Sequence, residues 1–347
     1  MGDPIATKTA PRARGRRGEI LLLLGSVLVG LVILEAASRA VLRATPPKGG
    51  YAPVRGHRSR EPLNAAGYRD TEHLVQKGTA IHRAVFLGDS FTYGVGVLFD
   101  DTYPKRVERA LSSERGETWE SIVLATPGFD TEQEAGVAAH EAFAFSPDLL
   151  VLGYVLNDAE DQDSAEQRRA EAWTRREEER RHPSLWRRSA FLSLIGDRLH
   201  ATLENRARIE NQRDLYREDR RGLMAVRRSV RQIADLAKQH GIPFVVVVFP
   251  LFANPMGDDY PFADLHRIVG DLCRNAGARV IDLLPYYRDL DWRLLVVEGA
   301  LDEHPNELAH RIAAQGLLAG LRDVLPPPAP PIETRHASAR THAVGGG

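Results

Sequence analysis

The chain has 347 residues, of which 43% are hydrophobic, and its formal net charge is -1. This length suits one sizeable globular domain with appendages. The balanced charge excludes the broad basic field with which proteins bind nucleic acid, so we expect no nucleic-acid partner. Cys273 is the single cysteine, which excludes an intramolecular disulfide, and no Cys/His cluster predicts a metal site. We expect no cofactor, and we interpret Cys273 as a buried apolar residue.

The first residues have the layout of a membrane-targeting segment. Residues 1–18 are polar and basic, and residues 19–43 contain a charge-free apolar run from Ile20 to Leu34. The apolar pattern resumes after Glu35 and reaches the length of about 20 residues that a bilayer span needs. We therefore predict a transmembrane signal anchor at 19–43. The alternatives are a signal peptide that is cleaved near Ala36-Ala37-Ser38 and a buried core helix.

The charges at the two ends of this segment predict its orientation. The basic residues before the apolar run are Arg12, Arg14, Arg16 and Arg17. Positive charge on this flank holds the tail at 1–18 in the cytoplasm, so the chain beyond the span is translocated. We expect a single-pass membrane protein whose main domain is extracytoplasmic, either periplasmic or extracellular. Glu35 and Arg39, which share one helix face, would lie near the far interface.

Composition also separates a linker, a domain and a tail. Residues 44–62 are rich in Pro, Gly and Arg, which is typical of a linker. We assign residues 63–325 to one globular domain. Residues 326–347 are Pro-rich and then end in Gly-Gly-Gly, so we expect them to form a disordered tail.

Short apolar runs alternate with helical patterns through this domain. The runs, rich in leucine or β-branched residues, are at 84–87, 121–124, 149–152, 244–249 and 279–283. The helical patterns are near 104–113, 131–144, 223–240, 262–276 and 306–322. Such runs are typical of strands buried in a parallel sheet. The alternation predicts a three-layer α/β/α sandwich, with a five-stranded, mainly parallel sheet and right-handed crossovers.

The segment 158–222 interrupts this alternation. It is dense in Arg and Glu, and it also carries apolar residues between Leu185 and Ile195. We interpret it as a charged, solvated helical insertion whose apolar face packs on the domain. The alternative is a lid over the active site, because the segment leaves the carboxyl end of a strand, where α/β proteins bind their ligands.

The strongest chemical motif is the run from Phe86 to Gly94, which reads FLGDSFTYG. A buried strand ends at Leu87, Gly88 permits a tight turn, and Ser90 stands where the next helix begins. The hydroxyl of such a serine points out of the carboxyl edge of the sheet. Its backbone N–H, unpaired at a helix start, can donate to a developing oxyanion. Ser90 is therefore the candidate nucleophile for attack on an acyl carbon.

With its surroundings, this motif resembles the first block of the SGNH/GDSL hydrolase superfamily, which has the form Gly-Asp-Ser after the first strand. The segment from Asn64 to Asp70, NAAGYRD, is similar to the Asn-x-x-Gly-aromatic-Arg segment that precedes this block in membrane-linked members. Those members include relatives of polysaccharide O-acetylation proteins. The similarity covers about residues 60–322. It implies the flavodoxin-like SGNH form of the sandwich and a serine hydrolase site.

Two more blocks of that family match after the second and third predicted strands. In ATPGFDT, Gly128 matches the glycine whose backbone N–H helps to form the oxyanion hole. In VLND, Asn157 matches the asparagine whose side-chain amide is the third donor, after Ser90 and Gly128. The chain departs from the family at Val155, where many members have glycine. The resemblance thus implies an oxyanion hole made by Ser90, Gly128 and Asn157.

The last block, LDEHPN, comes just before the last predicted helix. His304 matches the general base of the family and Asp302 matches its orienting acid. The resemblance implies that His304 takes the proton of Ser90, while Asp302 holds the imidazole tautomer and stabilises its charged form. Asp302 stands two positions before the histidine, whereas the commoner pattern has three. Glu303 is the alternative acid.

These matches predict a serine esterase that hydrolyses acyl esters, with a short acyl group and a glycan as a candidate carrier. One alternative is a polysaccharide O-acyltransferase with the same triad, because only the acyl acceptor differs. Outside the membrane acetyl-CoA is not at hand, so a transferase would need a membrane partner that delivers acyl groups. The other alternative is a catalytically weak glycan-binding or assembly protein on the same fold.

Overall fold

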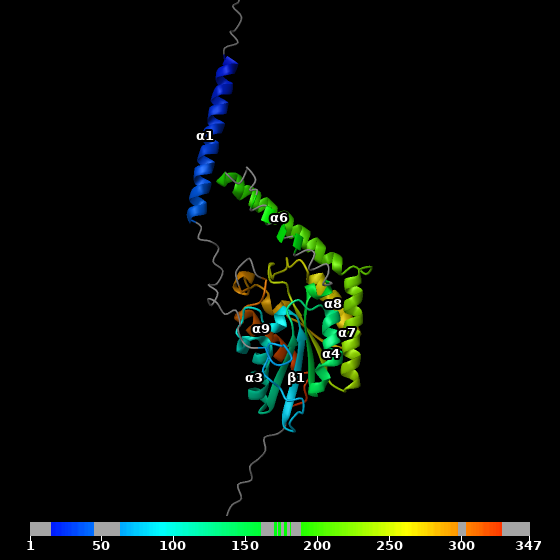
Figure 1. Cartoon of the computed structure of the whole chain (residues 1–347). Coiled ribbons are helices and arrows are strands. Elements are labelled where there is room, and N and C mark those ends of the chain that lie inside the picture. The colour runs from blue at the N-terminus through cyan, green and yellow to red at the C-terminus, as the bar shows by residue number, and fades with distance from the viewer. Residues whose placement is uncertain are drawn as a thin grey trace, which may run out of the picture. The chain divides into compact units, whose positions relative to one another are not determined.

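The structure is a computed structural model of the chain (Figure 1). It describes residues 15–44, 63–160, 189–297 and 303–327, and short helical stretches between 170 and 181. The chain divides into two compact units, which comprise residues 1–49 with 167–208 and residues 50–166 with 209–347. We call the first the helical unit and the second the sheet unit.

Five strands form one parallel sheet in the order β2-β1-β3-β4-β5. They are β1 (Ile81–Gly88), β2 (Thr118–Ala125), β3 (Leu149–Val155), β4 (Phe244–Phe249) and β5 (Arg279–Asp282). Every residue of β3 and β4 is buried, which explains why both strands appear in the sequence as continuous apolar runs. The register pairs Gly88 of β1 with Ala125 of β2 and Gly153 of β3, so these strands end at one edge.

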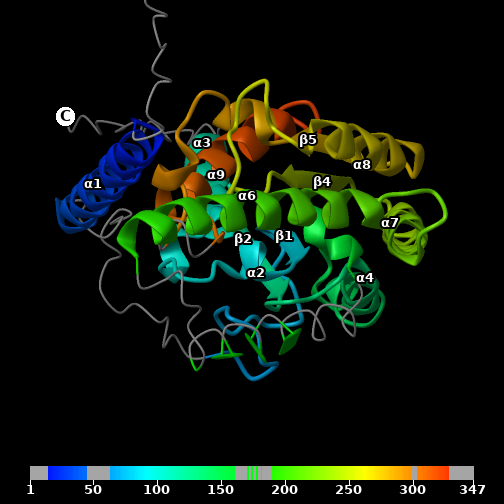
Figure 2. The ribbon, with the colours of Figure 1, turned by 90° about the horizontal axis from the view of Figure 1, so that it is seen from above.

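Helices cover both faces of the sheet (Figures 1 and 2). One layer consists of α3 (Tyr103–Arg115) and α9 (Glu307–Leu321), which pack on each other. The other consists of α4 (Thr131–His140), α7 (Arg221–Gln239) and α8 (Ala263–Asn275). The short elements are α2 (Ser90–Tyr93) and the 3-10 turns η1 (Phe99–Asp101), η2 (Ala142–Phe145), η3 (Leu156–Ala159), η5 (Leu284–Tyr287) and η6 (Trp292–Leu294). The predicted three-layer α/β sandwich is confirmed.

Local sequence explains where the longer helices begin and end. Asp130 forms a capping box with Gln133 at the start of α4, and Asn306 caps α9 by accepting from the N–H groups of its first turn. The predicted helix at 131–144 is shorter in the structure. It stops at His140 because Glu141 leaves the helical conformation, with φ -127° and ψ -43°.

As expected, Cys273 is buried in α8, and burial raises the pKa of its thiol to about 12.

The helical unit contains the long helix α1 (Gly15–Ala44) and the first part of α6 (Ala190–Leu215). The segment Gly18–Val41 of α1 is long and apolar enough to cross a membrane, and none of its most apolar window is buried. This agrees with the predicted span at 19–43 by length and composition. Helix α6 lies in the charged insertion, as expected for a helical segment. The predicted linker at 44–62 and most of the tail at 326–347 lie outside the described residues.

Candidate active site

Ser90 is the first residue of α2, directly after the end of β1. The side chain of Asp89 caps this helix by accepting a hydrogen bond from the N–H of Phe91 at 2.9 Å. Gly94 ends the helix with a φ of 78°, which glycine adopts without strain. The strand order reverses at β1, so Ser90 stands at the switch point where α/β proteins bind ligands.

Two glycines make the space in which α2 rests on the sheet. Gly88 ends β1 and pairs with Gly153 of β3. A Cβ atom at either glycine would overlap the side chain of Thr92. The hydroxyl of Thr92 lies 3.0 Å from the hydroxyl of Tyr103, which a Cβ atom at Gly153 would also overlap. The position of Ser90 therefore depends on small residues in two neighbouring strands.

The buried carboxyl group of Asp89 is where side chains from three elements meet. The hydroxyl of Ser90 donates to it at 3.3 Å, and the side chain of Asn157 also bonds to it. Burial raises the pKa of Asp89, while the hydrogen bond from the N–H of Phe91 and the electrostatic interaction with His304 act in the opposite direction. We did not single out Asp89 in the sequence, although it is the central residue of Gly-Asp-Ser.

Gly128 lies in the loop after β2, with a φ of 86° that favours glycine. The loop begins beside the nucleophile strand, because the N–H of Thr126 donates to the carbonyl of Gly88 at 3.3 Å. It ends beside η3, because the hydroxyl of Thr131 donates to the carbonyl of Asp158 at 3.3 Å. Gly128 thus belongs to a loop fixed at both ends to the site.

Asn157 lies in η3, directly after the carboxyl end of β3. Val155, where many SGNH members have glycine, is buried in an ordinary extended conformation, with φ -116° and ψ 148°. Its N–H donates to the carboxylate of Asp158 at 2.7 Å. The turn therefore forms without glycine at this position, and it directs the amide of Asn157 to Asp89.

His304 is held at the same edge by the chain on both sides of it. The N–H of Val297 donates to its carbonyl at 3.0 Å, and Asn306 caps α9 two residues later. The imidazole ring lies 5.8 Å from the ring of Phe91, measured between centroids, which places it beside the helix of Ser90. The structure thus brings Ser90, Asn157 and His304 to one place.

The two candidates for the acid of the triad are Asp302 and Glu303. Asp302 lies outside the described residues, so its place relative to His304 stays a prediction. Glu303, the alternative acid, is described and is partly buried. Across the described part of the chain, no group of three or more His, Cys, Asp or Glu side chains could hold a metal ion.

A parallel α/β sandwich with a serine, an amide and an imidazole at its carboxyl edge has the layout of a carboxylic ester hydrolase. A comparison with protein families supports this class. The model of the GDSL-like Lipase/Acylhydrolase family matches residues 86–312, which include the end of β1, the turn of Ser90 and His304. The chain belongs to this family. A search of the curated proteins found no match.

A search of the solved structures found matches at low sequence identity. TesA is 11% identical, with a TM-score of 0.45 over 70% of this chain and 100% of that one. A lipase/acylhydrolase from Enterococcus faecalis is 13% identical, with a TM-score of 0.43 over 72% of this chain and 100% of that one. An acetylxylan esterase from Geobacillus stearothermophilus is 14% identical, with a TM-score of 0.40 over 69% and 94%.

Proposed function

We propose that the chain hydrolyses short O-acyl esters through a covalent acyl-enzyme on Ser90, with an ester carried by a glycan as a candidate substrate. The observation that carries this proposal is the meeting of Ser90, Asn157 and His304 around Asp89 at the carboxyl edge of the sheet. A nucleophile, an oxyanion donor and a base need that proximity.

In this mechanism neutral His304 takes the proton of the Ser90 hydroxyl as the oxygen attacks the acyl carbon. The tetrahedral oxyanion is bound by the backbone N–H groups of Ser90 and Gly128 and by the amide of Asn157. His304 then returns the proton to the leaving alcohol, and the acyl group stays on Ser90. Water, activated by His304, repeats the sequence and releases the acid. We assign Asp302 the role of holding the imidazole tautomer.

An O-acyltransferase would share every step until the acyl-enzyme forms and would then use a sugar hydroxyl in place of water. The two functions are separated by incubating the protein with a chromogenic acetyl ester, with and without a glycan acceptor. We expect release of the chromophore and of acetate in both cases. Acetylated glycan as the main product would assign the transferase, and no turnover at all would favour a binding or assembly protein.

The nucleophile is tested with Ser90→Ala in the same assay. We expect activity to fall by about 10^4-fold or more, because the members of a triad act as a unit. Ser229→Ala is the matched control, since Ser229 is also a buried serine but lies in α7. It should keep full activity. An active Ser90→Ala protein with an unchanged unfolding temperature would remove Ser90 from the mechanism.

A further inference from the structure

The segment NAAGYRD, which precedes the nucleophile strand, folds into a closed turn. The N–H of Asn64 donates to the carbonyl of Tyr68 at 2.8 Å, and the side chain of Asn64 accepts from the N–H of Tyr68 at 2.9 Å. The N–H of Gly67 donates to the carbonyl of Asn64 at 2.8 Å. Gly67 has a φ of 88°, which a side chain would strain. Asparagine and glycine are therefore required by the turn itself.

The residues on either side of Arg69 attach this turn to the sheet unit. The hydroxyl of Tyr68 donates to Glu141 at 3.0 Å, just after α4. The carboxylate of Asp70 accepts from the N–H of Val123 in β2 at 2.7 Å, and Lys105 of α3 lies 3.6 Å from it. Arg69 is thus held between two anchored neighbours.

Arg69 bonds to the backbone that follows the candidate nucleophile. Its guanidinium donates to the carbonyls of Tyr93 at 2.9 Å, Gly94 at 2.7 Å and Val97 at 2.6 Å. The side chain is only 1% exposed, so these bonds lie away from water. The carbonyls stand at the carboxyl end of α2, where the helix dipole favours a positive charge. Hydrogen bonds from a charged donor are also stronger than neutral ones.

Helix α2 needs such support because it is a single turn. Its own hydrogen bonds are few: Tyr93 to Asp89 at 2.9 Å, Gly94 to Ser90 at 3.0 Å and Val95 to Ser90 at 3.2 Å. Helices this short are not stable by themselves. A shift of about 1 Å in a reacting group can lower the rate of an enzyme by about 10^2-fold.

We propose that Arg69 is a positioning residue for Ser90: its guanidinium holds the carbonyls of Tyr93, Gly94 and Val97 and so fixes the direction in which Ser90 presents its hydroxyl. The closed turn from Asn64 to Gly67 serves to deliver this arginine. The proposal rests on the proposed function, since it takes Ser90 as the nucleophile. It assigns a role to a motif that makes no contact with the reacting atoms.

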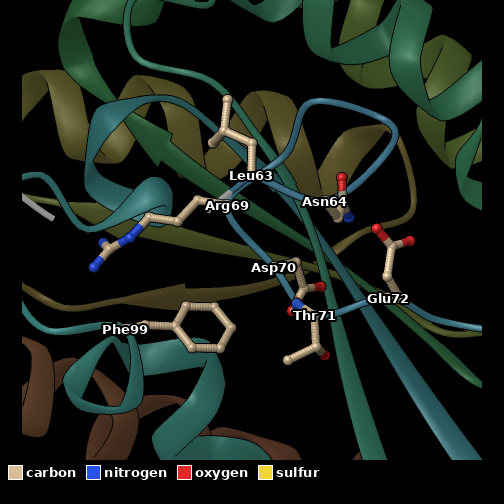
Figure 3. Close-up of a pocket in the computed structure, with 7 residues that line it drawn as sticks. All are labelled: Leu63, Asn64, Arg69, Asp70, Thr71, Glu72 and Phe99. Atoms are coloured by element: carbon tan, nitrogen blue, oxygen red, sulfur yellow. Dashed lines mark hydrogen bonds between the residues drawn. The ribbon is translucent and has the colours of Figure 1, made fainter. Parts of the chain in front are cut away.

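The surroundings of Arg69 allow a rescue experiment. A cavity of about 440 Å³ lies beside it, lined by Leu63, Asn64, Arg69, Asp70, Thr71, Glu72 and Phe99. Figure 3 shows the side chains of Arg69 and Asp70 pointing in different directions, with Phe99 nearby. Removal of the arginine side chain would enlarge this space. A free guanidinium ion could then enter and bond to the same carbonyls.

The chain offers a matched control in Arg83, near the start of β1. Arg83 is 2% exposed, and its guanidinium also donates to three carbonyls, those of Leu74, Val75 and Phe145. It precedes Gly88 by five residues, or about 17 Å along a strand. Arg83→Ala therefore removes three hydrogen bonds to carbonyls, together with the ion pair to Glu120, at the opposite end of the strand from Ser90.

The experiment compares Arg69→Ala, Arg69→Lys and Arg83→Ala in the full chain, with hydrolysis of an acetyl ester and the unfolding temperature as readouts. We expect Arg69→Ala to lower kcat by about 10- to 100-fold with little change in KM. Guanidinium chloride, at concentrations that do not unfold the protein, should restore part of kcat. Arg69→Lys keeps the charge but loses most of the hydrogen bonds. Its kcat should therefore lie between the values for the wild type and Arg69→Ala. Arg83→Ala should lose stability while its folded fraction keeps the kcat of the wild type.

Hydrogen exchange in the peptide that covers Ser90 to Val97 gives a readout that needs no catalysis. It should become faster in Arg69→Ala but not in Arg83→Ala. A wild type that hydrolyses no ester would count against the proposed function, and the exchange result would still decide the role of Arg69. The proposal is overturned if Arg69→Ala keeps full kcat, or if guanidinium restores nothing and exchange near Ser90 is unchanged.

Discussion

Residues of α2 and η3, two elements that lie far apart in the sequence, meet at the carboxyl group of Asp89. Burying a carboxyl group is costly unless it is hydrogen-bonded, and here the N–H of Phe91, the hydroxyl of Ser90 and the side chain of Asn157 supply the bonds. An asparagine amide carries two N–H donors. One can therefore orient the side chain on Asp89 while the other faces a substrate.

This arrangement predicts what the loss of the Asn157 amide would do. Asn157→Ala should lower kcat by about 10^2- to 10^3-fold and leave KM almost unchanged, because the amide bonds the charge that develops only after attack. Steady-state kinetics on an acetyl ester measures both constants. A rise in KM alone would show that Asn157 binds the ground-state substrate.

The acid that orients His304 can be identified by two conservative substitutions. If Asp302 accepts from Nδ1–H of the imidazole, Asp302→Asn presents an amide where an acceptor is needed and should lower kcat by about 10^4-fold. Glu303→Gln should then have almost no effect. The opposite result would move the acid to Glu303. Two silent substitutions would leave a Ser-His dyad.

At the scale of elements, α4 and η3 place two carboxyl groups in the interior. Glu134 of α4 is 0% exposed and Asp158 of η3 is 3% exposed. Neither carboxyl oxygen of Glu134 has a hydrogen-bond partner among the described residues. Burial raises the pKa of Glu134 well above its usual value of 4.5, and the charges of Asp89 and Asp130 add to the effect. Burial therefore favours the neutral form of the Glu134 carboxyl group in the folded protein.

The raised pKa of Glu134 makes stability depend on pH. Above about pH 4.5 ionisation of this carboxyl group lowers the free energy of the unfolded chain but not that of the folded chain. The contribution of Glu134 is thus fully present below pH 4.5 and is lost as the pH rises toward the folded pKa. Glutamine does not ionise, so Glu134→Gln should be more stable than the wild type at neutral pH. This difference in stability should shrink as the pH falls toward 4.5.

Urea unfolding at several pH values measures this difference. Glu132→Gln is the matched control, because Glu132 lies on the same helix but is 56% exposed and paired with Arg228. Glu132→Gln should change the free energy of unfolding by no more than about 0.5 kcal/mol at any pH tested. If the difference in unfolding free energy between Glu134→Gln and the wild type does not change with pH, the pKa of Glu134 is not raised in the folded state.

The sequence predicts the strands and helices of this fold better than it predicts the buried polar side chains around the candidate active site. Runs such as Phe244–Phe249 identify buried strands because their burial on both faces leaves only apolar residues. Arg69, Asp89 and Glu134 are polar residues whose roles follow from burial, and burial is decided by contacts with segments distant in the sequence. The motif FLGDSFTYG and its place after a predicted strand identify Ser90. No sequence pattern predicts the hydrogen bonds that Ser90 forms.

At the scale of the whole molecule, α1 exposes a long series of apolar side chains. Its leucine, isoleucine and valine side chains from Ile20 to Leu34 are 44% to 76% exposed. Glu35 and Arg39, near its carboxyl end, form a salt bridge at 2.8 Å. Glu35 also accepts from the N–H groups of Ala190 and Phe191 at the start of α6. An apolar surface of this kind needs a cover, and the charged residues of α1 lie at its two ends, outside the apolar run.

We predict that a bilayer supplies that cover, and that the chain makes a single span with the sheet unit exported. An alkaline phosphatase reporter fused after residue 330 should be active, and the fusion should stay with the membrane after alkaline extraction. Replacing Arg12, Arg14, Arg16 and Arg17 by glutamate should lower reporter activity, because positive charge on this flank sets the orientation. A shortened fusion released from the membrane would show a cleaved signal peptide. A reporter that works only in the cytoplasm would contradict export, since the sheet unit would then lie on the same side as the basic tail.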